Sequence, residues 1–328
     1  MRRFLVKTFI FVSPLLCLFL YLEVSLRRLP NSYATKRQYL EQGLATTEVL
    51  LSGSSHEFYG IRPSLLAPHT FSIAYVSQDL YYDTHLILLY LDRMPKLTTV
   101  IIPVSYRSLE SQLDVGTESW RVPFYYCFYG IPARERKFTL ANFSYLALYG
   151  YDAARTIMID GPPKLDIGSD GGFENSTSEP GSAEKLAEVQ PIVRHHSAMR
   201  REFLGPNVSA LEQTLAALQH RGIRAVFVTT PVYKTYSQAA RPETYRRMQD
   251  ALGELCRRYG VQYFNHMQDS RFTAADFNDI DHLDREGAEK FSLILHAEIF
   301  AHEPGGETAG SVKSAGRERP NKVGGSGF

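Results

Sequence analysis

The sequence predicts an α/β fold, in which a three-layer α/β/α domain with a mostly parallel sheet follows one transmembrane helix. Two observations predict the domain: short apolar segments alternate with helical ones between residues 45 and 300, and the apolar segments are rich in β-branched residues. Strands that helices cover on both faces have this composition and this order along the chain. A third observation, an apolar run near the N-terminus, predicts the transmembrane helix.

The apolar run covers residues 8–24 and follows a short basic segment. About 20 apolar residues cross a bilayer as a helix. A cleaved signal peptide has a shorter apolar core and small residues at the cleavage site, whereas the large side chains of residues 20–23 occupy that position here. We therefore expect residues 1–29 to form an uncleaved membrane anchor.

Three alternatives for this segment stay open: a cleaved signal peptide, a lipoprotein modified at Cys17, and a buried core helix. Leu16 stands before Cys17, where a lipoprotein signal has a small residue. A core helix is disfavoured because the segment is terminal and strongly apolar. Basic residues also follow the run, at Arg27 and Arg28, so charge alone does not orient the helix across the membrane.

Local signals define the elements of the domain. Asp79 is expected to cap the helix after the second strand, and Pro95 to end it. Asn207 is expected to cap a later helix, while Gly222 and Gly260 close two helices. The expected strands are residues 48–51, 71–75, 98–102, 223–228 and 261–264. The expected helices are residues 34–46, 80–94, 208–220, 242–259 and 285–300.

Two segments are predicted to lack regular structure. Residues 160–183 are rich in Gly, Pro, Ser and Asp, which is typical of a flexible insertion. Residues 303–328 contain almost no apolar side chains, so a disordered tail is predicted there. The domain itself is therefore expected to span residues 30–302.

Aromatic side chains gather in the middle of the chain, and Tyr125, Tyr126, Phe128 and Tyr129 lie outside any clear strand or helix period. Aromatic faces stack on sugar rings, so one hypothesis is a carbohydrate cleft with at least two exposed rings facing the site. The other is a small hydrophobic core beneath a long insertion. We favour the core, because buried aromatic rings contribute strongly to packing.

Composition disfavours several functions. The formal net charge of +1 offers no electrostatic basis for binding nucleic acid. The three cysteines, Cys17 among them, allow at most one disulfide within the domain. No Cys/His spacing indicates zinc. The adjacent pair His195-His196 favours a polar surface or cleft role over metal binding, because neighbouring side chains diverge. We expect no metal and no cofactor.

Two short segments more than 200 residues apart carry the candidate chemistry. Gly53-Ser54-Ser55-His56 follows an expected strand, at the sheet edge where α/β proteins form their sites. Residues 279–283 read Asp-Ile-Asp-His-Leu and precede the last helix. A serine is inert at neutral pH until a base removes its proton, for which His282 is the candidate, with Asp279 orienting its imidazole. Alternatively, Ser54 or Ser55 simply caps a helix.

These two segments resemble the first and last sequence blocks of the SGNH (GDSL-type) hydrolases. The resemblance is to a membrane-anchored branch that includes the D-alanyl-transfer protein of teichoic acid synthesis and the acetyl-transfer proteins of exopolysaccharide export. It implies Ser55 as the nucleophile, His282 as the base and Asp279 as its partner. It covers roughly residues 45–300, but it is specific only at the two ends and near residues 71–83.

The chain departs from the family where the oxyanion hole is expected. The second block falls at residues 74–78 and has no glycine, and the third follows Val104 with no Gly-x-Asn-Asp. The N–H groups of Ser55 and Ser77 remain as donors, and Ser105 as a hydroxyl. One missing donor costs about 100- to 1,000-fold in rate. Compensation by other groups, a slow or specialised catalyst, and loss of catalysis are the alternatives.

The resemblance implies a serine-dependent ester hydrolase or O-acyltransferase that acts on an acylated saccharide or cell-envelope glycan. The alternative is a non-catalytic SGNH-like protein that binds glycan or assists an acyltransferase. The implied partners are an acyl donor or acylated saccharide, the membrane through the N-terminal helix, and a multi-spanning membrane O-acyltransferase. The domain is expected on the extracytoplasmic side, in the periplasm or at the cell surface.

Overall fold

The computed structural model describes residues 1–135, 139–160, 165–174 and 181–300. The predicted tail, residues 303–328, lies outside the described residues, as do residues 161–164 and 175–180 of the predicted insertion at 160–183. The described part of that insertion includes an antiparallel bridge between Ile167 and Phe173. Its flexibility and the boundaries of the 30–302 domain stay predictions.

The fold is α/β, as predicted, and is built on a five-stranded parallel sheet with the strand order β2-β1-β3-β4-β5. The strands are β1 (Val49–Leu51), β2 (Thr70–Ser72), β3 (Thr99–Pro103), β4 (Arg224–Thr229) and β5 (Gln262–Asn265). All five lie where the sequence predicts strands. In this order β1 is flanked by β2 and β3, so the segment that follows β1 emerges from inside the sheet.

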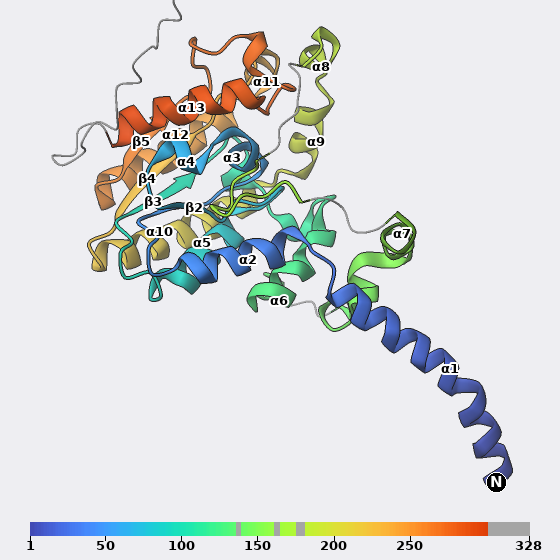
Figure 1. Ribbon diagram of the computed structural model, residues 1–328. Helices are drawn as coiled ribbons and strands as arrows, with labels where there is room; N and C mark the ends of the chain where they lie inside the picture. Colours follow the sequence, from blue (N-terminus) through green and yellow to red (C-terminus); the bar gives the residue numbers. More distant parts are fainter. Residues whose placement is uncertain (136–138, 161–164, 175–180, 301–328) are drawn as a thin grey trace, which may run out of the picture.

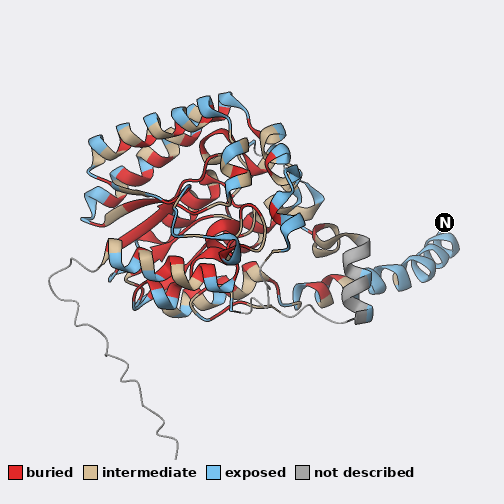
Figure 2. Cartoon of the chain, turned by 90° about the horizontal axis from the view of Figure 1, so that it is seen from above, coloured by how far each residue is buried: buried red, intermediate tan, exposed pale blue. Residues whose placement is uncertain are grey.

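Helices cover both faces of the sheet (Figure 1). Leu50, Val100 and Phe227 point to one face, where they join a core with α2 (Ser32–Gly43), α5 (Leu80–Leu91), α6 (Val122–Tyr129), α10 (Leu204–His220) and α12 (Pro242–Tyr259). Leu51 and Ile101 point to the other, towards α4 (Pro63–Leu66) and α13 (Arg285–Ile299). This alternation along the strands makes both faces of the sheet buried, as Figure 2 shows.

The remaining helices are α1 (Arg2–Arg27), α3 (Ser55–Gly60), α7 (Tyr145–Asp160), α8 (Ala183–Ala187), α9 (Gln190–Ala198) and α11 (Lys234–Ala239). Of these, α1 extends away from the domain with its side chains exposed (Figure 2). It contains an 18-residue window with a mean hydropathy of 2.1, long and apolar enough to cross a membrane. The same length and composition fit a signal sequence.

Glu23 marks the place where α1 meets the domain. Its carboxylate accepts hydrogen bonds from the N–H groups of Tyr145 (2.6 Å) and Leu146 (3.2 Å) and from the hydroxyl of Ser144 (3.0 Å). An acidic side chain is favoured at a helix N-terminus, where backbone N–H groups lack partners. The charged residue in the apolar run therefore fastens the end of α1 to the start of α7.

Two segments differ from what the local sequence indicates. Asn207 does not cap a helix: α10 begins at Leu204, and the buried Asn207 amide donates to the carbonyls of Ser108 (3.2 Å) and Leu109 (3.0 Å). Tyr125, Tyr126, Phe128 and Tyr129, for which the sequence showed no clear strand or helix period, lie on the helix α6, which Gly130 ends with a φ of 71°. In both segments, contacts with residues distant in the sequence determine the local structure.

The aromatic cleft hypothesis is contradicted. Tyr125 is fully buried, and Phe128 and Tyr129 are each only 8% exposed. Tyr126 is half-buried. In the core between α2, α5 and α6, Tyr125 packs on Tyr82 and Phe128 on Tyr33, and Tyr129 packs against Tyr75 and Tyr90. These residues therefore belong to the hydrophobic core, as we favoured.

Phe128→Ala should lower the free energy of unfolding by about 3–5 kcal/mol, because it leaves a cavity among packed rings. Leu140→Ala is the control, since Leu140 is 72% exposed and its loss should cost less than about 0.5 kcal/mol. Denaturant unfolding of the full chain in detergent measures both. An unchanged stability for Phe128→Ala would show that this ring is not part of the core.

Candidate active site

The site begins with a tight turn at the carboxyl end of β1. Gly53 has a φ of 131°, and a Cβ at this position would lie 2.5 Å from Oε2 of Glu57. Only glycine adopts this backbone conformation readily and leaves room for Glu57. The Gly53 N–H donates to Oδ1 of Asp83 on α5 (2.8 Å), and this hydrogen bond holds the turn against α5.

The sequence left open whether Ser54 or Ser55 caps a helix, and in the structure Ser54 caps α3. It precedes α3, its hydroxyl accepts from the His56 N–H (3.4 Å), and its own N–H donates to the Glu57 carboxylate (2.7 Å). This is a capping box, which satisfies backbone donors at the helix start. Ser55 is consequently the first helical residue, and its hydroxyl is not needed for the cap.

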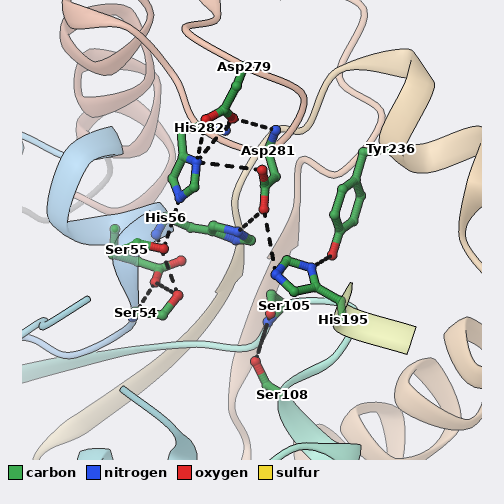
Figure 3. A network of polar contacts seen from close by, with 11 residues as sticks. Ser54, Ser55, His56, Ser105, Ser108, His195, Tyr236, Asp279, Asp281 and His282 are labelled. Atoms are coloured by element: carbon green, nitrogen blue, oxygen red, sulfur yellow. Dashed lines mark hydrogen bonds and ion pairs between the residues drawn. The ribbon is translucent and has the colours of Figure 1, made fainter. Parts of the chain in front are cut away.

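The structure brings Ser55, His282 and Asp279 together (Figure 3). The Ser55 Oγ lies 2.9 Å from Nε2 of His282, although the two residues are 227 positions apart. Nδ1 of His282 lies 3.0 Å from both carboxylate oxygens of Asp279. The backbone N–H groups of His282 and Asp281 donate to Asp279 as well, at 2.8 and 3.0 Å. With its proton on Nδ1, the imidazole leaves Nε2 free to accept the Ser55 proton.

A second carboxylate, that of Asp281, also approaches Nδ1 of His282. Asp281 is buried, and its oxygens lie 3.5 Å from Nδ1 of His282, 3.2 Å from Nε2 of His56 and 3.9 Å from Nε2 of His195. The hydroxyl of Tyr236 lies 3.0 Å from Nδ1 of His195. Figure 3 shows the resulting network, in which three imidazoles surround one carboxylate.

Sequence reasoning missed the roles of Asp281 and His56 and gave His195 only a general polar role. Asp281 and His56 each stand next to a residue that was identified, so proximity to the two segments was the available signal. His195 comes from α9, and its neighbourhood depends on how that helix packs. No spacing in the sequence indicates that His195 lies close to Asp281.

Electrostatics in the network favour a charged His282. Burial lowers the pKa of His282, but the charge of Asp281 and the hydrogen bond and charge of Asp279 outweigh it and raise the pKa to about 9. Burial and the charge of Arg107 lower the pKa of His195 to about 2, so this imidazole is neutral. Burial raises the pKa of Asp281, yet the neighbouring His282 and His56 hold it well below its usual range.

Ser55 and His282 open onto a cavity of about 350 Å³. Its lining also includes Ser77, which has a φ of 62°, a left-handed conformation that is uncommon outside glycine. Ser105 does not line this cavity. It lies in a smaller neighbouring pocket beside Gly53, with its hydroxyl 2.9 Å from that of Ser108.

Donor atoms of His56, Asp281 and His282 lie within 4.8 Å of one another, close enough to hold a metal ion. Nδ1 of His282 is already 3.0 Å from Asp279, and Nε2 of His56 is 3.2 Å from Asp281. A metal ion would have to displace these contacts. The donor set is therefore better suited to orienting His282 than to metal binding.

Comparison with known proteins assigns no family. No family model matches the chain, and no curated protein matches it. One solved structure that is similar comes from Streptococcus pneumonia and is provisionally assigned there as a platelet activating factor. It has a TM-score of 0.35 and 12% sequence identity, over 88% of this chain and 97% of that chain. A similarity at this level carries no functional information about the present chain.

The pH dependence of Ser55 reactivity should follow His282. Only the neutral imidazole accepts the Ser55 proton, so the rate of fluorophosphonate labelling should rise with pH and level off above about pH 9. Asp281→Asn removes the neighbouring charge that raises this pKa most, and the midpoint should move to lower pH. Asp92→Asn is the control, because Asp92 is exposed and pairs with the distant Arg221.

An unchanged midpoint in Asp281→Asn would show that Asp281 does not act on His282.

The raised pKa of His282 also makes the stability of the fold depend on pH. The folded-state pKa lies above the unfolded value of about 6.5. The charged imidazole therefore contributes its full stabilisation below about pH 6.5. This contribution is lost as the pH rises through about 9.

Proposed function

We propose that this protein is a serine-dependent ester hydrolase or O-acyltransferase that acts on an acylated saccharide or cell-envelope glycan. The observation that carries the proposal is the hydrogen-bond chain from Asp279 through His282 to Ser55. It stands at the carboxyl edge of a parallel sheet, next to a cavity large enough for a small ligand. The resemblance of both segments to SGNH hydrolases supports the same chemistry and suggests the glycan.

In the first half of the reaction, Ser55 Oγ attacks the carbonyl carbon of the ester while Nε2 of His282 takes its proton. The Asp279 carboxylate holds the imidazolium that forms, through Nδ1. As the tetrahedral intermediate collapses, the bond to the leaving alcohol breaks and His282 returns the proton to that oxygen. An acyl-enzyme remains on Ser55.

In the second half, a water molecule or an acceptor hydroxyl attacks the acyl-enzyme. His282 takes the proton of the attacking group and gives it back to Ser55 when the new bond has formed. Water yields a carboxylic acid, which is hydrolysis, and a saccharide hydroxyl yields a new ester, which is transfer. Both products require the same residues, so they differ only in which acceptor reaches Ser55.

Stabilisation of the oxyanion is proposed for the N–H groups of Ser55 and Ser77. Both residues line the cavity, and among the described residues neither N–H donates a hydrogen bond. The left-handed backbone of Ser77 is the conformation that glycine favours, which supports its position as the counterpart of the family glycine. Ser105 stays a weaker candidate, because its hydroxyl is engaged with Ser108.

One observation favours the alternative, a non-catalytic glycan-binding or acyltransferase-accessory protein. Gln112 is the only side-chain amide among the described residues that line the cavity, and no asparagine is found there. Loss of one oxyanion donor slows a hydrolase by about 100- to 1,000-fold. The alternative therefore predicts a protein that binds its ligand but does not turn it over.

Ser55→Ala should abolish labelling by a fluorophosphonate probe and lower ester hydrolysis by at least about a thousand-fold, because it removes the nucleophile. Ser64→Ala is the matched control, an exposed serine on α4 that should keep both activities. Mass spectrometry of the labelled full chain and hydrolysis of p-nitrophenyl acetate measure the two effects. Equal labelling of wild type and Ser55→Ala would exclude Ser55 as the nucleophile.

We further propose that α1 anchors the domain on the extracytoplasmic side, beside a multi-spanning membrane O-acyltransferase that supplies acyl groups. The proposal rests on the length of α1 and on the resemblance to membrane-anchored relatives. Through Glu23 and α7, α1 is fastened directly to the domain, which would hold the site close to the bilayer. A gene for such an acyltransferase next to this one would support the partnership.

Protease added to intact spheroplasts should digest the domain, because an extracytoplasmic domain is accessible without lysis. A cytoplasmic protein probed in the same sample is the control and should stay intact until the cells are lysed. Protection of the domain in intact spheroplasts, followed by digestion after lysis, would place it in the cytoplasm and contradict the topology.

A further inference from the structure

The cavity next to Ser55 is lined by three arginines, Arg107, Arg121 and Arg194. They come from separate parts of the fold: Arg107 follows β3, Arg121 precedes α6, and Arg194 lies on α9. Guanidinium groups bind carboxylates and phosphates through paired hydrogen bonds. Whether they are available to a ligand depends on their partners in the protein.

Among the described residues, the acidic side chains that line the cavity pair with only one of the three arginines. Glu118 pairs with Arg121 at 2.8 Å. The Asp79 carboxylate accepts hydrogen bonds from the backbone N–H groups of Leu113 (2.7 Å) and Tyr82 (3.2 Å), so its partners are backbone groups. Asp281, as described above, faces the histidines. No acidic residue of the cavity lining remains for Arg107 or Arg194.

Arg107 is the stronger of the two candidates. Its Nε is buried and has no hydrogen-bond partner among the described residues. Buried polar groups in proteins are nearly always hydrogen-bonded, so each exception needs a physical reason. Arg107 lines both the cavity and the smaller pocket beside Gly53, and its charge acts on His195 and His282. Arg194 is exposed, and its side chain likewise forms no ion pair within the described chain.

We propose that this cavity binds a ligand with an anionic group, a carboxylate or a phosphate, which Arg107 holds with the help of Arg194. The inference rests on the proposed function, because the anion would belong to the acylated saccharide or to the acceptor. The acidic group then fixes the ligand while its ester or hydroxyl faces Ser55. A neutral saccharide leaves Arg107 unpaired and binds less well.

Binding is tested in the Ser55→Ala protein, so that the readout does not depend on turnover. Calorimetry of the full chain in detergent compares methyl glucuronide, glucose 6-phosphate and methyl glucoside. At least one anionic ligand should bind about tenfold or more tightly than methyl glucoside, since a hydrogen bond to a charged group is worth about that much. Preference for methyl glucuronide indicates a carboxylate, and preference for glucose 6-phosphate a phosphate.

Adding Arg107→Met should remove this preference and leave the affinity for methyl glucoside unchanged. Arg194→Met should reduce the preference in part, and because Arg194 is exposed this variant does not put folding at risk. Arg258→Met is the matched control: Arg258 is exposed on α12, pairs with Glu212, and should not affect binding.

Three results would overturn the proposal: equal affinity for anionic and neutral ligands, no detectable binding of either anion, or an equal loss for all three ligands in Arg107→Met. An equal loss would mean that the guanidinium supports the fold or the reacting centre instead of an anionic substituent. Fluorophosphonate labelling of the wild-type protein is unaffected by these results. Failure of the anion site can therefore be distinguished from failure of the proposed function.

Discussion

The buried carboxylate of Asp281 connects three segments that are distant in the sequence. It faces His56 at the start of α3, His195 on α9 and His282 in the loop before α13. A buried charge is costly unless polar partners surround it, and here three imidazoles do so. Because His56 directly follows Ser55, and His282 contacts Ser55, the Asp281 carboxylate helps to position both neighbours of Ser55.

The parallel sheet positions Ser55 itself. β1 lies between β2 and β3, so the Gly53 turn at its carboxyl end lies between the carboxyl ends of these two strands. Asp83 holds the turn through the Gly53 N–H, and the Ser54 cap starts α3 at once. Ser55 is thereby held by backbone geometry, while His282 is held by Asp279 and Asp281. Contacts within the protein therefore hold both sides of the site.

Much of the fold was predictable because strands and helices leave local signals. The five strands are short apolar segments, and Asp79 and Gly260 mark helix ends as expected. Ser55, Asp279 and His282 were identified because two segments with matching chemistry stand at opposite ends of the domain. The structure brings them within hydrogen-bond distance, whereas their catalytic roles stay a prediction.

What the sequence did not predict depends on tertiary contacts. α6 carries apolar or aromatic side chains at almost every position, so no polar residues mark its exposed face, although its buried residues 124, 125, 128 and 129 do follow a helical spacing. Asn207 satisfies carbonyls of a distant loop, which no local capping rule includes. Arg107 is a single basic residue in a loop, and only the structure shows that its side chain lines the cavity without a partner.

The most direct test of the Ser55 mechanism is to find where the acyl group is attached during turnover. The protein would be mixed with p-nitrophenyl acetate, quenched in acid within the first turnovers, and digested for peptide mass spectrometry. We expect one acetyl group, on Ser55, and none when His282→Ala is treated in the same way. Ester hydrolysis with no acetyl group on Ser55, or with the group on another residue, would contradict the mechanism.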